Sequence, residues 1–139
     1  AGEGILFTRM YASGDRSDKG LAAILASVPA LGKVSIMAHP NLTSRLLYLT
    51  RPFKEKRYST AFLYGGDLEF ANTKSFMLNA GFDRIIGKSD FPKEMYNSKW
   101  GAHDEVLFDR QLAEADHEEG PFFHTMFTLS SHEPFEVHK

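Results

Sequence analysis

Short apolar runs alternate along this chain with segments whose apolar residues recur at helical spacing. The strand-like runs span residues 4–8, 58–64, 82–86 and 122–129. The helical segments span residues 18–28, 42–49, 70–80 and 104–115. Because strands and helices alternate at this spacing, we predict a layered α/β fold with a mostly parallel sheet.

Local signals indicate where some of these elements begin and end. Gly81 follows the third helical segment and is typical of a helix C-terminus, and Asp104 is suited to cap the fourth. Pro52 either kinks the second helical segment or marks a new helix that begins near Thr50, and the sequence leaves both open. Residues 122–129 are apolar at nearly every position, which predicts a strand covered on both faces.

Composition excludes several classes of protein. Hydrophobic residues make up 42% of the 139 residues, which is enough for a folded core. The absence of cysteine excludes disulfides, thiolate metal sites and a cysteine nucleophile. The 16 basic and 18 acidic side chains give a net charge of -2, so we expect no nucleic acid partner.

Neither a membrane span nor a signal peptide is predicted within the chain. The longest apolar stretch, residues 21–31, is too short to cross a bilayer, and no basic segment precedes it. The chain starts at Ala1 without a methionine and stops soon after a strand-like run. We therefore expect residues 1–139 to be a single partial domain, truncated at both ends, of a longer protein.

Three polar loops, at residues 13–18, 65–70 and 130–135, follow predicted strands. Strands of a parallel sheet end at one edge, where binding sites form, so we expect these loops to lie together.

Ser17 stands beside Arg16 at the predicted start of a helix. A helix N-terminus and a guanidinium both favour phosphate or sulfate, which makes Ser17 a candidate nucleophile. The alternative, which the local sequence alone favours, is that Ser17 or Asp18 simply caps the helix.

The other two loops contain further candidates. Gly65 and Gly66 let the backbone approach a ligand, and Asp67 and Asn72 can bind hydroxyl groups or lie near a metal. The alternative is an ordinary turn with Asp67 or Glu69 at the start of a helix. His132 either hydrogen-bonds an anionic oxygen and protonates a leaving group, or is an ordinary surface histidine.

The remaining histidines are interpreted structurally. His124 lies within an apolar run and is predicted to be a core residue. Asp116 and His117 look like a pair of metal ligands, but together with Glu118 and Glu119 they indicate a solvated helix end. The spacing of histidines and carboxylates predicts no complete metal site within the chain.

Four segments in this order resemble the sulfatase-like branch of the alkaline phosphatase superfamily, and in particular the lipoteichoic acid synthase-like phosphoglycerol transferases. They are residues 11–20 (YASGDRSDKG), 62–67 (FLYGGD) with Phe70 and Asn72, 99–104 (KWGAHD) and 127–135 (FTLSSHEPF). The resemblance implies a three-layer α/β/α catalytic domain with a mostly parallel, alkaline phosphatase-like sheet, incomplete in this chain.

The resemblance also implies a chemistry. Ser17 would ligate a divalent metal (manganese, magnesium or zinc) and attack the phosphorus of a glycerophospholipid or other phosphoester donor. A hydroxyl acceptor would then resolve the covalent phosphoryl intermediate. The family's substrate-binding histidine falls on His132, and Arg16, Asp67 and Asn72 are further substrate-binding positions.

The same resemblance places most of the metal site and all membrane anchoring elsewhere. The remaining metal ligands would lie outside this chain, so we expect the chain alone to hold no metal tightly and to be inactive. Membrane helices outside this chain would anchor the parent protein in a bacterial cell membrane. The catalytic domain would then face the extracytoplasmic side.

Some residues depart from the family pattern and keep two alternatives open. In lipoteichoic acid synthases a Trp and an Arg flank the residue that matches Asn72, whereas Ala71 and Thr73 flank it here, so a phosphoglycerol donor is not specified. A sulfate-ester or phosphate-ester hydrolase is one alternative. In a sulfatase, a Pro and an Arg would follow the nucleophile, but residues 18–20 after Ser17 contain neither. A non-catalytic α/β binding module is the other.

Overall fold

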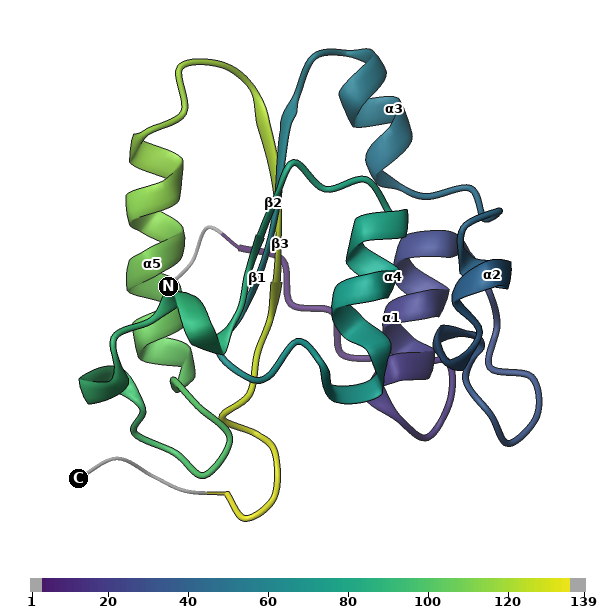
Figure 1. Cartoon of the computed structure of the whole chain (residues 1–139), viewed down its shortest axis with the longest axis horizontal. Helices are drawn as coiled ribbons and strands as arrows, with labels where there is room; N and C mark the ends of the chain where they lie inside the picture. Colours follow the sequence, from purple (N-terminus) through teal and green to yellow (C-terminus); the bar gives the residue numbers. More distant parts are fainter. Residues whose placement is uncertain (1–3, 136–139) are drawn as a thin grey trace.

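The computed structural model describes residues 4–135, and in this range a parallel three-stranded sheet lies between two layers of helices (Figure 1). The sheet consists of β1 (Ser59–Tyr64), β2 (Arg84–Ile86) and β3 (Phe122–Phe127), in the order β2-β1-β3. The register places Ala61 of β1 opposite Arg84 on one side and His124 on the other. The predicted three-layer α/β fold with a parallel sheet is therefore confirmed.

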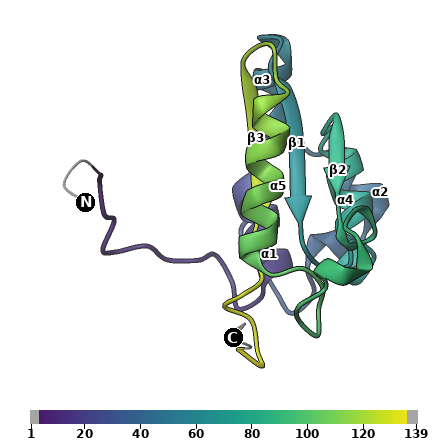
Figure 2. The ribbon, with the colours of Figure 1, turned by 90° about the vertical axis from the view of Figure 1, so that its left-hand side faces the viewer.

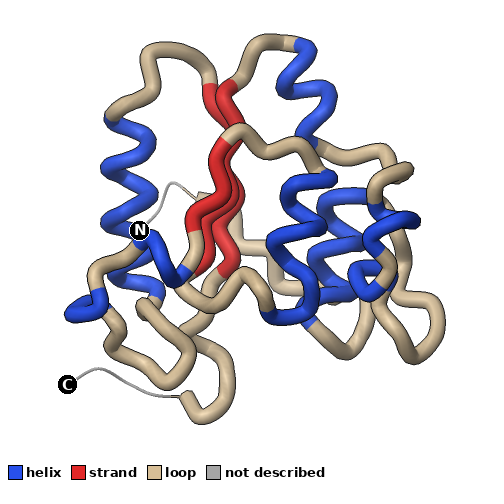
Figure 3. The backbone as a smooth tube through the Cα atoms, in the orientation of Figure 1, coloured by secondary structure: helices blue, strands red, loops and turns tan. Residues whose placement is uncertain are grey.

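The helices divide unequally between the two faces of the sheet (Figures 1 and 3). One face is covered by α5 (Asp104–Asp116). The other is covered by α1 (Ser17–Ala26) and α4 (Thr73–Asn79), with α2 (Pro40–Thr43) and α3 (Thr50–Glu55) on the same side. Short 3-10 helices occupy Ile36–Ala38, Phe70–Asn72, Lys88–Asp90 and Lys93–Met95.

The central strand β1 contributes to two hydrophobic cores, one on each face. Phe62 and Tyr64 belong to the core beneath α1 and α4, whereas Ala61 and Leu63 belong to the core beneath α5. Successive side chains of a strand point to opposite faces, so a strand buried on both sides must be apolar at consecutive positions. This is why an uninterrupted apolar run, rather than an alternating one, becomes the central strand.

The predicted strand at residues 4–8 is wrong. These residues form no strand, and Ile5 and Leu6 are each 85% exposed. Figure 2 shows the segment extending away from the rest of the chain. A strand exists only through hydrogen bonds to a neighbouring strand, and the described sheet pairs only β1, β2 and β3 with one another. Residues 4–8 have the composition of a strand, but they pair with none of the three strands of the described sheet.

Several predicted boundaries need smaller corrections. A new helix does begin at Thr50, as one of the two alternatives for Pro52 proposed. The single helix predicted at residues 70–80 is divided, because Ala71 and Asn72 have positive φ angles of 54° and 58° ahead of α4. Gly81 follows α4 with a φ of 74°, which confirms its predicted position at the helix C-terminus.

Strand β3 is shorter and less buried than its sequence predicts. It ends at Phe127, and most of its residues are only half-buried. The physical reason is its place at the edge of the described sheet, where it pairs with β1 alone. The prediction that residues 122–129 form a strand covered on both faces is therefore wrong in its degree of burial.

Gly65, at the end of β1, lets two backbone segments approach each other closely. Its carbonyl oxygen accepts a hydrogen bond of 3.0 Å from the N–H of Ala102. A Cβ atom on Gly65 would lie 2.1 Å from the carbonyl oxygen of Ala102. The glycine pair was predicted to let backbone approach a ligand, whereas Gly65 serves the packing of the chain itself.

We expect Gly65→Ala to lower the free energy of unfolding by about 1–3 kcal/mol, because the added methyl group must separate β1 from Ala102. The matched control is Gly20→Ala within α1, where an added Cβ meets no atom within 4 Å. That variant should gain about 0.5–1 kcal/mol from helix propensity. Urea unfolding of both variants measures the difference, and a Gly65→Ala protein as stable as the wild type would contradict the close approach.

Candidate functional site

A cavity of about 190 Å³ lies at the carboxyl ends of β1 and β3. Its walls come from the start of α1, the ends of both strands, the loop after β3, and Phe70, Ala71 and Thr73. Ser17 and His132 both line it, although they are far apart in the sequence. The expectation that these two residues share one cleft is therefore confirmed.

Ser17 is the first residue of α1, and Arg16 occupies the N-cap position with an extended backbone. The predicted position of Ser17 at a helix N-terminus is confirmed, although no strand precedes it at residues 4–8. The first N–H groups of an α-helix have no partner within the helix, so this end attracts an anion. Ser17 is exposed at this helix end, so a ligand can reach it from solvent.

The loop that precedes Ser17 is fixed by contacts to residues 30–32. The Lys19 ammonium, in a side chain only 8% exposed, donates hydrogen bonds to the Asp15 carboxylate at 2.8 Å and to the Gly32 carbonyl at 3.2 Å. The hydrogen bond from Lys19 lowers the pKa of Asp15. The Ser13 hydroxyl accepts a hydrogen bond from the N–H of Ala30 at 3.1 Å. These contacts hold the position of Ser17 at the start of the helix.

Arg16 and Asn72 line an adjoining cavity of about 310 Å³, which shares Asp18 and Ala71 with the cavity of Ser17. The Arg16 guanidinium lies 3.3 Å from the Asp18 carboxylate. The Asn72 side-chain amide donates a hydrogen bond of 3.1 Å to a backbone carbonyl, that of Met37. Both predicted positions are therefore next to the Ser17 cavity rather than within it.

Asp67 lies apart from Ser17 and His132. Its carboxylate accepts a hydrogen bond from the N–H of Glu69 at 2.9 Å, as in an ordinary turn. It lines a separate cavity with Lys74 and Lys88, among others. The loop of Asp67 was expected to lie with those of Ser17 and His132, but the Asp67 carboxylate bonds within its own turn and lines a different cavity.

The loop that carries His132 is attached to residues 100–104. The Trp100 ring contacts the His132 ring edge-on at 5.0 Å between centroids, and its indole N–H donates to the Glu133 carbonyl at 2.8 Å. Asp104 was predicted to cap α5, but His103 occupies the N-cap position and Asp104 is the first helical residue. The Asp104 carboxylate contacts the loop after β3 instead, a role that capping rules did not predict.

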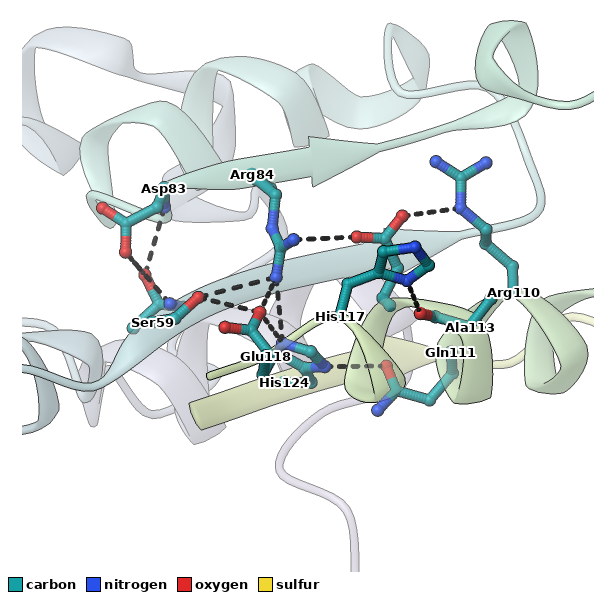
Figure 4. Close-up of polar contacts among 11 residues, drawn as sticks. Ser59, Asp83, Arg84, Arg110, Gln111, Ala113, His117, Glu118 and His124 are labelled. Atoms are coloured by element: carbon teal, nitrogen blue, oxygen red, sulfur yellow. Dashed lines mark hydrogen bonds and ion pairs between the residues drawn. The ribbon is translucent and has the colours of Figure 1, made fainter. Parts of the chain in front are cut away.

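A second polar cluster lies at the opposite, amino ends of the strands (Figure 4). Arg84 forms ion pairs with Glu114, at 3.0 Å, and with Glu118. His124 hydrogen-bonds Gln111 at 3.1 Å and Glu118 at 3.2 Å. The prediction that Glu118 belongs to a solvated helix end is wrong, because its side chain is only 11% exposed.

Burial and neighbouring charges shift the pKa values in this cluster. The side chain of His124 is 2% exposed, and burial, together with the positive charge of Arg84, lowers its pKa against a smaller opposing effect of Glu114. Burial alone would raise the pKa of Glu114, but the Arg110 hydrogen bond and the charges of Arg110 and Arg84 outweigh it and lower the pKa. The side chain of His124 is therefore buried in the protein, as predicted for a core histidine, and its burial disfavours the charged form.

The residues described do not fit a complete divalent metal site. No group of three or more histidine, cysteine or acidic side chains placed to hold a metal occurs within residues 4–135. Around Ser17, Asp15 is paired with Lys19 and Asp18 with Arg16.

A family model and a curated relative both match this chain. The Sulfatase family model matches residues 1–139. Phosphoglycerol transferase I of Xanthomonas campestris pv. campestris (strain B100) is 32% identical over 93 residues, which cover 58% of this chain and 12% of that protein. The chain thus spans only a small part of the curated relatives it matches.

Two crystal structures share the fold. A protein in the alkaline phosphatase superfamily from Vibrio parahaemolyticus is 30% identical with a TM-score of 0.83, over 96% of this chain and 33% of that one. The lipoteichoic acid synthase LtaP from Listeria monocytogenes is 22% identical with a TM-score of 0.77, over 91% of this chain and 31% of that one.

Within residues 4–135, no helix has the length and apolar content to cross a membrane.

The lowered pKa of His124 predicts a pH dependence of stability. As pH falls below about 6.5, the unfolded chain binds a proton at this histidine before the folded chain does. We therefore expect the free energy of unfolding to decrease in this range, by at most about 1.4 kcal/mol per pH unit from this group. Urea unfolding between about pH 7 and pH 5 measures the slope.

Two variants assign that slope to a residue. His124→Gln should flatten the dependence, whereas His117→Gln, at an exposed position in the same region, should leave it unchanged. A slope that His124→Gln leaves intact would contradict the assignment.

Proposed function

Because the chain belongs to the Sulfatase family and is related to phosphoglycerol transferases, we propose that it carries the nucleophile and a substrate-binding histidine of a phosphoryl-transfer enzyme. The observation that supports this most is the shared cavity of Ser17 and His132 at the carboxyl ends of β1 and β3. Sites of parallel α/β sheets form at this edge. Ser17 is the nucleophile and His132 a substrate-binding residue in this proposal.

In the first half of the reaction, the Ser17 oxygen attacks the phosphorus of a phosphodiester donor. The bond from phosphorus to the leaving alcohol breaks, and that alcohol takes up the proton that Ser17 loses. The N-terminal N–H groups of α1 and the Arg16 guanidinium stabilise negative charge on the phosphoryl oxygens. His132 donates a hydrogen bond to one of these oxygens, or passes the proton lost by Ser17 to the leaving oxygen.

In the second half, a hydroxyl acceptor attacks the phosphoryl group on Ser17. The bond from phosphorus to Ser17 breaks, and the proton of the acceptor returns to Ser17. A divalent metal, manganese, magnesium or zinc, would lower the pKa of the Ser17 hydroxyl and neutralise phosphate charge when bound. Ser17 is the one ligand to it that we propose within this chain.

The donor and the cellular location follow from the relatives and remain part of the proposal. We propose a glycerophospholipid or other phosphoester as donor, because phosphoglycerol transferase I of X. campestris is among the relatives. We further propose that the parent protein acts at the bacterial cell membrane, with this domain on the extracytoplasmic side. A nucleic acid partner has no place in this reaction.

Mass spectrometry of the full-length protein tests the nucleophile. After incubation with a glycerophospholipid and manganese, we expect a glycerophosphoryl adduct on the peptide that contains Ser17. Ser17→Ala should abolish the adduct and lower turnover roughly a thousandfold or more.

The matched control is Ser131→Ala, at a second serine that lines the same cavity. This variant should retain the adduct. An adduct on Ser131, or none on Ser17, would contradict the proposal, and turnover of an aryl sulfate with no turnover of the phospholipid would favour a sulfate-ester hydrolase.

A further inference from the structure

The loop that carries His132 is held at its beginning by a single carboxylate. The Asp104 carboxylate accepts hydrogen bonds from the N–H groups of Leu129, at 2.6 Å, and Ser130, at 3.2 Å. The Ser130 hydroxyl in turn accepts a hydrogen bond from the N–H of Asp104 at 3.0 Å. Three hydrogen bonds thus join the first residue of α5 to the point where the chain leaves β3.

This attachment continues to His132 through the backbone. The N–H of His132 donates a hydrogen bond of 2.9 Å to the carbonyl of Leu129, the residue that Asp104 holds. Leu129 is buried in the core beneath α1 and lines the cavity of Ser17. The position of the His132 backbone therefore depends on Leu129, and that of Leu129 on Asp104.

Asp104 is well placed to act as a fixed anchor. It begins α5, the 13-residue helix that covers one face of the sheet, and the positive end of the helix dipole stabilises its negative charge. Hydrogen bonds to a charged acceptor are stronger than those between neutral groups. By contrast, His132 lies on an exposed loop, whose residues need such anchors to keep one conformation.

We propose that Asp104 is a positioning residue for His132, which it holds within reach of a phosphoryl group at Ser17. This inference rests on the proposed function of His132. Asp104 itself touches neither substrate nor Ser17 in this proposal, and its effect on ligand binding passes through His132. The sequence alone predicts Asp104 to be a helix cap. The hydrogen bonds of its carboxylate instead connect it to the loop that carries His132.

Calorimetric titration of the full-length protein with inorganic phosphate tests the proposal. His132→Ala should weaken phosphate binding about tenfold, as expected for the loss of one hydrogen bond to a charged group. Asp104→Ala should weaken it by a similar factor, and Asp104→Asn, which keeps one acceptor oxygen, by less. Asp109→Ala, at an exposed acidic residue of the same helix, should leave binding unchanged.

The double variant separates positioning from general loss of structure. If Asp104 acts through His132, Asp104→Ala should cause no further weakening in the His132→Ala protein. Equal weakening by Asp104→Ala with and without His132 would overturn the proposal. It would also be overturned if His132→Ala weakened binding tenfold while Asp104→Ala left it unchanged. An unchanged affinity in His132→Ala would instead contradict the proposed role of His132 itself, which distinguishes the two failures.

Discussion

The burial of β1 on both faces and its hydrogen bonding along both edges determine the rest of the structure. Ala61, Phe62 and Leu63 are fully buried, and both neighbouring strands pair with β1 in parallel. A parallel neighbour requires a crossover connection, so helices must cover the faces of the sheet. The carboxyl ends of the strands then emerge together, and the chain must turn there in loops. The cavity of Ser17 and His132 lies at this edge because β1 is central.

The sequence predicted those elements whose evidence is local and periodic. The apolar run that becomes β1 and the helical spacing that becomes α5 were both identified, since burial on one or two faces leaves a pattern within a few residues. The strand expected at residues 4–8 was wrong, because pairing depends on a partner elsewhere in the chain. The exposure of β3 was misjudged for the same reason: its place at the edge of the sheet is a property of topology.

The site shows the same division between local and tertiary information. Ser17 and His132 could be brought together from the sequence because strand ends share one edge of a parallel sheet. Asp67 satisfied the same rule, yet its carboxylate bonds within its own turn, so position after a strand is not sufficient. Asp104 and Glu118 were assigned to a helix cap and a solvated end, since their partners lie on other elements. No spacing within the sequence shows those partners.

The two ends of the sheet differ in how their polar side chains are partnered. At the amino ends, Arg84 is paired with two carboxylates, and the buried His124 completes the cluster, so each charge there has a partner. Removing one partner of such a cluster would leave a partly buried charge unpaired, so its members depend on one another. At the carboxyl ends, Ser17 and His132 are exposed and line an open cavity, while their neighbours Lys19 and Asp104 hold the backbone. A binding site needs this arrangement, because a reactive group must be fixed through its backbone while its side chain stays accessible.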